Sequence, residues 1–281
     1  MKKTYIIAEI GINHNGDLSI AKKLVDIAAA AGCDAVKFQK RDPDVCVPDH
    51  QKNVAKDTPW GSMTYLEYKH KTEFGKEEYD EIDKYCKERK IRWSASPWDL
   101  GSLEFLLKYD LPFIKIPSAM LTNKALLEGC LSSGKKVILS TGMSTEDEIS
   151  EAVSFLEERI TVKSKSSFAI LHCNSTYPAP LEELNLSCIE TLKEKYGCEV
   201  GYSGHEFRLG TSVAAVYLGA TIIERHITLD RSMWGSDHLS SVEPQGLFKL
   251  VSGIRELEKA YGNGVISVTE SEKDVRKKLR G

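Results

Sequence analysis

Two lysines lie inside short segments that are otherwise apolar. Lys37 and Lys115 alternate with apolar neighbours, so both are expected to point inward from strands. A buried ammonium group is costly unless it meets an anion. Hydroxyl donors at comparable positions are Ser96, Ser118 and Ser203. Point charges combined with hydroxyl groups indicate a phosphate site, and an ion pair of the lysines with Glu9 or Glu224 is the alternative.

A pair of histidines suggests a metal centre. His205 and His226 follow two consecutive apolar segments and are 21 residues apart. Two imidazoles, with water or substrate oxygens completing the shell, suit a divalent transition metal. Two hydrogen-bonded histidines without a metal are the alternative. His14 and His172 are weaker candidates for ligands.

The elements that must position these residues recur regularly. Eight strand-length segments are rich in β-branched residues: 5–9, 35–39, 91–95, 113–116, 136–140, 168–172, 199–202 and 221–224. Helical patterns separate or follow them at 18–31, 77–90, 103–109, 123–131, from 144 onward, and at 184–196, 209–218 and 245–261. This alternation predicts a parallel sheet, and eight such units predict a (β/α)8 TIM barrel of the α/β class. The first turn lacks the glycine pattern of a dinucleotide-binding fold.

The carboxyl ends of barrel strands form the active face of such a fold. Every predicted strand ends in polar residues, among them Glu9, Gln39, Ser96, Ser118, Tyr177, Ser203, His205, Glu224 and His226. The loop after the eighth strand carries Asp237, which could accept hydrogen bonds from a polyol. A solvated aspartate in a helix-entry loop is the alternative for Asp237.

We predict one barrel domain over residues 1–265, with a tail at 266–281. A long insertion at 40–75 follows the second strand, and it contains several prolines and many charges but no long apolar helix. Loops of this length are usually functional or disordered.

The composition excludes several classes of protein. Hydrophobic residues make up 41% and charged residues 28%, which is typical of a globular chain. The net charge of −3 gives no basic field for nucleic acid. No apolar run is long enough for a membrane span, and the N-terminus predicts no signal peptide. Seven widely spaced cysteines indicate reduced thiols and therefore a cytoplasmic protein.

Seven ordered motifs carry a resemblance to a known family. They are Ala8-Glu9-Ile10-Gly11-Ile12-Asn13-His14-Asn15-Gly16, Lys37-Phe38-Gln39, Lys115-Ile116-Pro117-Ser118, Ser140-Thr141-Gly142-Met143, Leu171-His172-Cys173-Asn174-Ser175-Thr176-Tyr177-Pro178, Gly201-Tyr202-Ser203-Gly204-His205 and Glu224-Arg225-His226. Over essentially its whole length the chain resembles the sialic acid synthases. The resemblance implies condensation of phosphoenolpyruvate with an open-chain N-acyl amino sugar of the N-acetylmannosamine type, giving a nonulosonic (sialic) acid and phosphate.

The resemblance also implies roles for particular residues. Positions matching phosphoenolpyruvate contacts are Lys37, Ser96, Lys115, Ser118, Ser175 and Ser203. Positions matching sugar contacts are Gln39, Tyr177, Glu224 and Asp237. Glu9, Lys115 and Glu224 are the implied catalytic residues, and His205 and His226 are the implied ligands of Mn²⁺ or Mg²⁺.

The sequence departs from the family pattern at three places. Ser175 replaces a common asparagine, and Gly204 replaces a common aspartate. Family members usually continue into a small antifreeze-like domain, which brings an arginine to the sugar site of the partner subunit in a homodimer. Without it, the barrel is expected to bind phosphoenolpyruvate but to bind the sugar weakly. A separate small protein could substitute, or cations of the 40–75 insertion could, namely Arg41, Lys52, Lys56, Lys69 and Lys71.

Three other functions stay open. A related barrel synthase could make a 3-deoxy-ulosonate from a phosphorylated aldose, although this requires a second cationic site and arginines are few near the strand ends. An aldolase could form a Schiff base at Lys115. A barrel with a degenerate site could act without catalysis, but the retained charged residues argue against this.

Overall fold

A computed structural model describes residues 1–160 and 168–281. Eight parallel strands form the central sheet: β1 (Tyr5–Gly11), β2 (Ala35–Lys40), β5 (Arg92–Pro97), β6 (Phe113–Ile116), β7 (Lys136–Ser140), β8 (Phe168–Cys173), β9 (Glu199–Gly204) and β10 (Ile222–His226). Their order is β5-β2-β1-β10-β9-β8-β7-β6. The Ser94 hydroxyl donates to the Phe113 carbonyl at 2.5 Å between β5 and β6, where the ring nearly closes. The fold is the single-domain (β/α)8 barrel that the sequence predicts.

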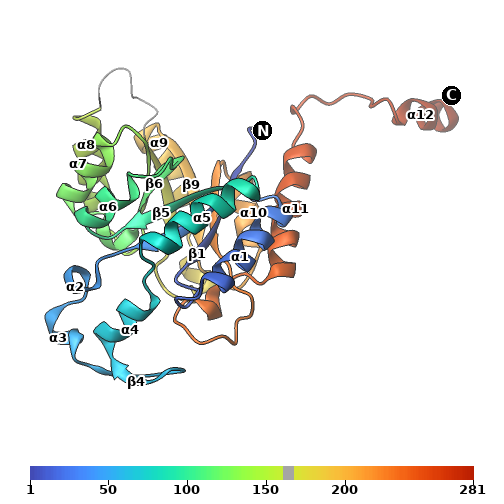
Figure 1. Cartoon of the computed structure of the whole chain (residues 1–281). Coiled ribbons are helices and arrows are strands. Elements are labelled where there is room, and N and C mark those ends of the chain that lie inside the picture. Colours follow the sequence, from blue (N-terminus) through green and yellow to red (C-terminus); the bar gives the residue numbers. More distant parts are fainter. Residues whose placement is uncertain (161–167) are drawn as a thin grey trace.

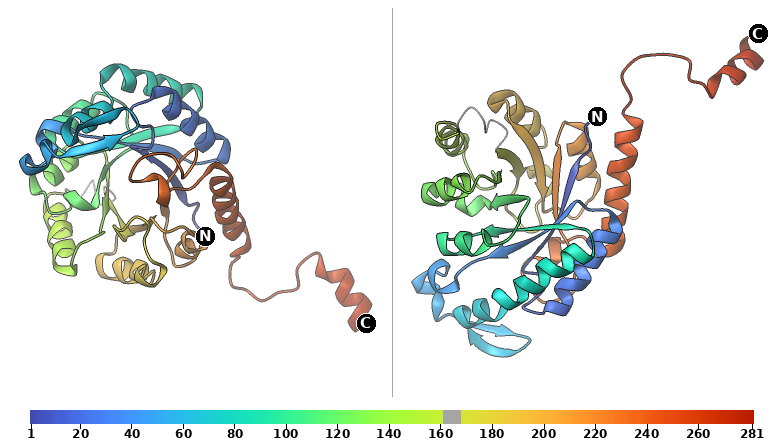
Figure 2. Two further views of the ribbon diagram at one scale, coloured as in Figure 1. Left: turned by 90° about the horizontal axis from the view of Figure 1, so that it is seen from below. Right: turned by 45° about the horizontal axis from the view of Figure 1, so that its top comes forward.

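Helices cover the outside of the sheet (Figure 1). They are α1 (Leu18–Ala31), α5 (Lys76–Glu88), α6 (Leu100–Leu106), α7 (Lys124–Ser132), α8 (Glu146–Glu157), α9 (Cys188–Tyr196), α10 (Gly210–Tyr217) and α11 (Pro244–Ala260). The predicted helix over 184–196 begins too early, because a 3₁₀ turn at Leu181–Glu183 precedes α9 and Leu184 is buried in the connecting loop. The left panel of Figure 2 looks along the barrel and shows this ring of helices.

The strand interior is layered, which decides where chemistry can occur. An apolar cluster fills one end of the barrel and includes Ile7, Ala35, Phe113, Ile138 and Ile222. Because side chains alternate along a strand, the next inward-facing positions toward the carboxyl ends fall two residues later. These positions are Glu9, Lys37, Lys115, Ser140 and Glu224, all buried. The polar site therefore stands on an apolar floor.

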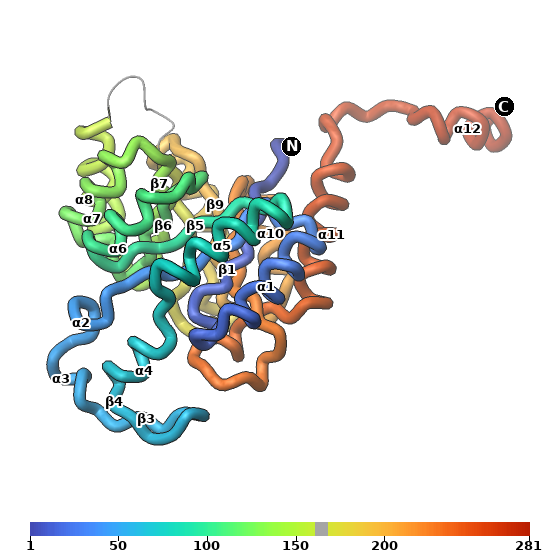
Figure 3. The backbone as a smooth tube through the Cα atoms, in the orientation of Figure 1, coloured from blue at the N-terminus to red at the C-terminus, as the bar shows by residue number. Residues whose placement is uncertain are grey.

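The 40–75 insertion forms a lobe beside the barrel mouth, drawn in blue to cyan in Figure 3. It contains short elements: α2 (Pro43–Cys46), α3 (Asp49–Lys52), the antiparallel hairpin of β3 (Ala55–Thr58) and β4 (Gly61–Thr64), and α4 (Tyr65–Thr72). The expectation of no long apolar helix agrees with these bounds. Thr64 caps α4 reciprocally with Glu67, so this lobe has a locally specified start.

The last residues extend away from the barrel. The short helix α12 (Glu272–Arg280) is exposed along its whole length and lies apart from the other elements (Figures 1 and 2). Within the described residues, no helix combines the length and apolar character needed to cross a bilayer.

Candidate active site

Strand register brings the predicted site residues together at one end of the barrel. Glu9 of β1 lies opposite Lys37 of β2 on one side and His226 of β10 on the other. Glu224 of β10 lies opposite Ser203 of β9. Residues paired in adjacent parallel strands point to the same face, so these side chains share the interior of the barrel mouth.

The two lysines and two glutamates form one buried charge network. Lys37 Nζ is 2.6 Å from Glu9 Oε2 and 3.9 Å from Glu224 Oε2, and Lys115 Nζ is 3.4 Å from Glu224 Oε1. All four side chains are at most 5% exposed. The alternative of ion pairs with Glu9 and Glu224 therefore describes the ligand-free protein. An arriving anion would have to share these lysines with the carboxylates.

Hydroxyl groups complete this network. Lys37 donates to Ser96 Oγ at 2.9 Å, and Lys115 donates to Ser140 Oγ at 2.7 Å. The Ser203 hydroxyl donates to Glu224 Oε1 at 3.1 Å. Lys37, Lys115 and Glu224 are thus each held by a hydroxyl group as well as by a counter-ion, which fixes their orientation before any ligand binds.

The two glutamates differ in their protonation. Burial raises the pKa of Glu9 to about 7, against the opposing effect of Lys37. Burial also disfavours the charged form of Glu224, but Lys115 and Lys37 outweigh it and lower that pKa to about 2. Burial lowers the pKa of Lys115. Near neutral pH, Glu224 is a fixed negative charge and Glu9 can exchange a proton, a division of roles common at catalytic sites.

A cavity of about 170 Å³ lies at the centre of these groups. Its lining includes twelve of the thirteen predicted site residues, Glu9, Lys37, Gln39, Ser96, Lys115, Ser118, Ser175, Tyr177, Ser203, His205, Glu224 and His226. The thirteenth, Asp237, does not line it, but its Oδ2 is 3.8 Å from His226 Nδ1. The sequence motifs and the geometry therefore converge on the same place.

Two serines meet over a glycine at one side of the cavity. The Gly142 backbone N–H donates to Ser118 Oγ at 3.1 Å. A Cβ atom at Gly142 would lie 2.1 Å from Ser175 Oγ and 2.8 Å from Ser118 Oγ, closer than real contacts allow. Only glycine lets both hydroxyl groups approach here, so Ser175 belongs to the site although its family counterpart is often an asparagine.

The two candidate metal ligands lie side by side as neutral imidazoles. The His205 and His226 ring centroids are 5.4 Å apart. His205 Nδ1 is 2.6 Å from the Asn174 carbonyl, which accepts from an N–H there and leaves Nε2 with its lone pair, 3.0 Å from the Tyr177 hydroxyl. Burial lowers the pKa of His205 to about 3 and also lowers the pKa of His226.

These two histidines could supply part of the ligand shell of a metal ion. His226 Nδ1 is buried and has no hydrogen-bond partner among the described residues. A neutral imidazole whose other nitrogen is held by a carbonyl is the form that ligates metals. No group of three or more His, Cys, Asp or Glu side chains in the described part of the chain is arranged to hold a metal. The donor set therefore fits two imidazoles with exogenous oxygens completing the shell.

The weaker histidine candidates lie elsewhere. His14 stacks on Phe74 at a centroid distance of 3.8 Å, and its Nδ1 is 3.1 Å from the Gly16 backbone nitrogen. His172 Nε2 is 2.7 Å from the Leu184 carbonyl. Neither ring lines the cavity that contains His205 and His226. The sequence could not show these contacts, because the partners are distant or backbone groups.

Sequence reasoning gave no role to five lining residues, Trp98, Pro117, Ala119, Met143 and Cys173. It also gave no role to Ser140, which holds Lys115. Ser140 and Cys173 lie two residues beyond the inward-facing Ile138 and Leu171, so the alternation of the strands could have found both. Trp98 follows the end of β5, where a strand pattern gives no orientation.

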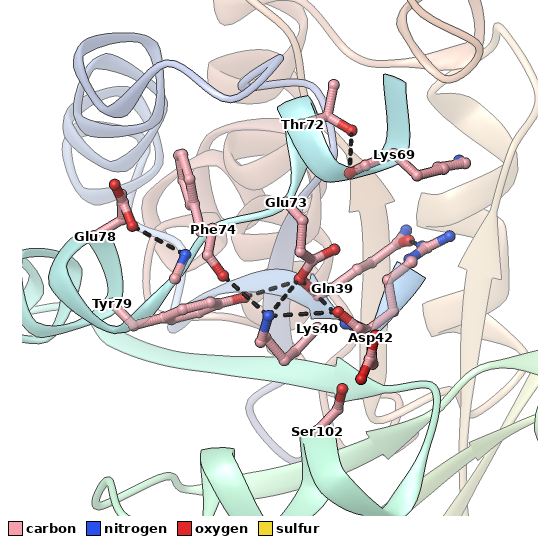
Figure 4. A network of polar contacts seen from close by, with 12 residues as sticks. Gln39, Lys40, Asp42, Lys69, Thr72, Glu73, Phe74, Glu78, Tyr79 and Ser102 are labelled. Atoms are coloured by element: carbon pink, nitrogen blue, oxygen red, sulfur yellow. Dashed lines mark hydrogen bonds and ion pairs between the residues drawn. The ribbon is translucent and has the colours of Figure 1, made fainter. Parts of the chain in front are cut away.

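A clasp ties the two ends of the insertion to the barrel beside the site (Figure 4). Lys40 Nζ is 2.9 Å from Glu73 Oε1 and donates to the Phe74 carbonyl at 3.0 Å. The Arg41 backbone N–H donates to the same Glu73 carboxylate at 3.1 Å. The Tyr79 hydroxyl donates to the Gln39 carbonyl at 2.9 Å. The start and the end of the lobe are therefore held together.

Comparisons with known proteins agree with one another. A sequence model of the NeuB family matches residues 24–266. An N,N'-diacetyllegionaminic acid synthase of Campylobacter jejuni is 40% identical, covering 99% of this chain and 85% of that protein. An N-acetylneuraminate-9-phosphate synthase of Drosophila melanogaster is 39% identical, and the alignment covers 99% of this chain and 72% of that protein. The solved structure of an N-acetylneuraminic acid (sialic acid) synthetase of Leptospira borgpetersenii, in complex with citrate, superposes with a TM-score of 0.85. The two chains are 35% identical, and the superposition covers 99% of this chain and 93% of that chain.

Proposed function

Because the chain belongs to the NeuB family, we infer that it condenses phosphoenolpyruvate with an open-chain N-acyl amino sugar, giving a nonulosonic acid and phosphate. It is a phosphoenolpyruvate-dependent transferase of the sialic acid synthase type. The observation that carries the proposal is one cavity lined together by two lysines, two glutamates, five serines and two histidines.

Phosphoenolpyruvate would bind against the lysine side of the cavity. Lys37 and Lys115 supply positive charge, and Ser96, Ser118 and Ser203 supply hydroxyl groups. Ser175 adds a further hydroxyl beside Ser118. Fixed cations that are already oriented stabilise charge as it develops on the leaving phosphate.

The carboxylates would act on the reacting carbons. The enol carbon of phosphoenolpyruvate attacks the sugar aldehyde, and positive character builds on the adjacent enol-ether carbon. Glu224 stays ionised and stabilises that charge, while Glu9 orients the incoming water and takes its proton, because the pKa of Glu9 is raised to about 7. Phosphate then leaves as the C–O bond breaks.

His205 and His226 would hold a divalent ion, Mn²⁺ or Mg²⁺, whose contribution is Lewis-acid polarisation of the sugar aldehyde. This assignment rests on two neutral imidazoles with ring centroids 5.4 Å apart at the mouth. Tyr177 stacks on His205 at 4.0 Å and would fix the ring that binds the ion.

The sugar would lie toward the rim, over Gln39, Tyr177 and Asp237. Gln39 Nε2 is 3.5 Å from Glu9 Oε1, and Asp237 approaches His226, so both residues border the reacting centre from the solvent side. Their amide, phenol and carboxylate groups match a polyol with several hydroxyl groups. We further propose that the enzyme acts in the cytoplasm as a homodimer.

The test is a phosphate-release assay over a panel of N-acyl amino sugars with phosphoenolpyruvate and Mn²⁺, followed by mass spectrometry of the product. Sugar-dependent release, with a product whose mass is that of both substrates plus one water less phosphate, supports the proposal. Release without any sugar, or condensation with a simple aldose instead, would contradict it.

A further inference from the structure

The insertion carries four cations for which the described residues provide no carboxylate within 4.0 Å of the charged nitrogen. They are Arg41, Lys56, Lys69 and Lys71. Other lysines of the same region are paired: Lys40 Nζ is 2.9 Å from Glu73 Oε1, and Lys52 Nζ is 2.8 Å from Asp49 Oδ1. Among the described residues of the insertion, these four cations therefore differ from Lys40 and Lys52 in lacking a carboxylate partner. The positions of three of them, described next, suggest a reason.

Two of these cations converge on one aromatic ring. Lys56 Nζ, from β3, lies 5.1 Å from the Tyr68 ring centroid, and Lys69 Nζ, from α4, lies 5.2 Å from it. Tyr68 packs edge-on against Trp234 at 5.2 Å. Trp234 belongs to the loop after β10 that also carries Asp237, so the two ammonium groups face the rim of the barrel mouth and not the outer surface of the lobe.

Arg41 lies between this cluster and the catalytic cavity. Its guanidinium group stacks on Trp98 at 4.2 Å from the ring centroid and donates to the Gln39 side-chain carbonyl. Trp98 and Gln39 both line the catalytic cavity. Arg41 Nε and Trp98 Nε1 are buried N–H donors without an acceptor among the described residues. Buried donors are normally satisfied, so a missing acceptor at this point indicates a ligand.

The cluster has a net positive environment. Burial, together with nearby Arg41, lowers the pKa of Lys69 to about 8 against the opposing effect of Asp237. Partial burial of a cation beside other cations is unfavourable unless an anion joins them. The clasp of Lys40 with Glu73 and Phe74 holds Arg41 and the end of α4 in place, and Figure 4 shows Lys69 and Gln39 extending toward the same side.

This cation site is separate from the lysine pair on the cavity floor. Lys37 and Lys115 are balanced by Glu9 and Glu224, whereas Arg41, Lys56 and Lys69 have no carboxylate within 4.0 Å in the part of the chain that the structure describes. A substrate reaching from the floor to the rim would therefore meet positive charge at both ends. The sequence identified these cations as substitutes for a missing arginine, but it could not show that they gather in a second site, because Arg41, Lys56 and Lys69 are spread over 29 residues.

We propose that Arg41, Lys56 and Lys69 bind a phosphate monoester at the distal end of the acceptor, so that the preferred acceptor is a phosphorylated N-acyl amino sugar. This proposal rests on the proposed function. Its chemistry is that of charge-assisted hydrogen bonds from guanidinium and ammonium groups to phosphate oxygens, with the Trp98 indole N–H as a further donor.

The experiment compares N-acetylmannosamine with its 6-phosphate ester as acceptors at saturating phosphoenolpyruvate and Mn²⁺. The wild-type enzyme should use the phosphate ester with a kcat/KM at least about tenfold higher than that of the neutral sugar. Lys69→Met and Arg41→Met should each raise KM for the phosphate ester by about ten- to a hundredfold and change KM for the neutral sugar less than about threefold. Lys52→Met, in a lysine already paired with Asp49, is the matched control and should change neither value.

Equal use of both acceptors by the wild-type enzyme, or equal losses on both acceptors in the variants, would overturn the proposal. Calorimetric titration of the sugar phosphate into the enzyme saturated with phosphoenolpyruvate separates this result from failure of the proposed function. Binding that is lost in Lys69→Met supports the cation site even without turnover. Binding of phosphoenolpyruvate and turnover of the neutral sugar alone would uphold the proposed function and refute the phosphorylated acceptor.

Discussion

Lys37 Nζ lies 2.6 Å from Glu9 Oε2, between residues directly opposite each other on adjacent strands. Both side chains are buried, and they are assigned to different steps, Lys37 to the phosphate and Glu9 to the water. In the ligand-free protein, the carboxylate proposed for catalysis therefore neutralises the cation proposed to bind phosphoenolpyruvate. Under this proposal, substrate binding weakens the ion pair and releases Glu9 for chemistry.

Glu9→Gln should separate binding from turnover. Removing the negative charge frees Lys37, so phosphoenolpyruvate should bind about three- to tenfold more tightly at pH 8, where Glu9 is mainly ionised. Turnover should fall by at least about a hundredfold, the scale of a lost general base. Calorimetry and steady-state kinetics measure the two effects, with Glu73→Gln in the clasp as control. Weaker binding in Glu9→Gln would show that Glu9 positions Lys37 and does not compete with the substrate.

Lys115→Met should weaken phosphoenolpyruvate binding by about 2–5 kcal/mol, because it removes a buried cation and leaves Glu224 facing the substrate. Fluorescence or calorimetric titration measures the affinity. Lys136→Met provides the control, since Lys136 of β7 pairs with Glu199 of β9 at 2.5 Å, across the intervening β8, and does not line the cavity. An unchanged affinity in Lys115→Met would make that lysine purely structural.

His226→Ala should lower the metal content of the protein. Elemental analysis after dialysis against Mn²⁺ should give close to one equivalent for the wild type and a small fraction for the variant. Chelator should abolish turnover, and Mn²⁺ should restore it. His172→Gln is the control, because His172 meets the Leu184 carbonyl outside the histidine pair. Full activity in chelator, or a metal content of His226→Ala equal to that of the wild type and of His172→Gln, would contradict the assignment.

The sequence predicted the barrel well because its signal is local. The strands show alternation, and that alternation placed Lys37 and Lys115 inside without any knowledge of contacts. The pairing of lysines with glutamates depends on closure of the barrel between strands far apart in the chain, so the sequence left phosphate and ion pair as alternatives. The convergence of Lys56 and Lys69 on Tyr68 depends on a hairpin folding over α4, which no periodicity reveals.

Stability should fall on the acid side because of His14. Burial lowers the pKa of His14 to about 3 from an ordinary 6.5. Between these values the unfolded chain binds a proton that the folded chain excludes, so this contribution is complete above about pH 6.5 and is lost as the pH falls toward 3. The slope is about 1.4 kcal/mol per pH unit.

Urea unfolding of wild type and His14→Asn at pH 7.5, 6.0 and 5.0 measures this effect. The variant should be less stable at pH 7.5, because Asn cannot stack on Phe74 as the imidazole does, but its stability should depend less steeply on pH. His50→Asn, at an exposed histidine, should keep the wild-type slope. Identical slopes for wild type and His14→Asn would show that His14 is protonated in the fold.

The measurement that tests the central claim most directly uses phosphoenolpyruvate labelled with ¹⁸O in the bridge between carbon and phosphorus. The labelled substrate is turned over with an accepted amino sugar and Mn²⁺, and the released phosphate is examined by mass spectrometry. If water adds to the enol-ether carbon and the C–O bond breaks, the label leaves with the phosphate, and its release depends on the sugar. Phosphate without the label would mean cleavage at phosphorus and would contradict the condensation proposed for this site.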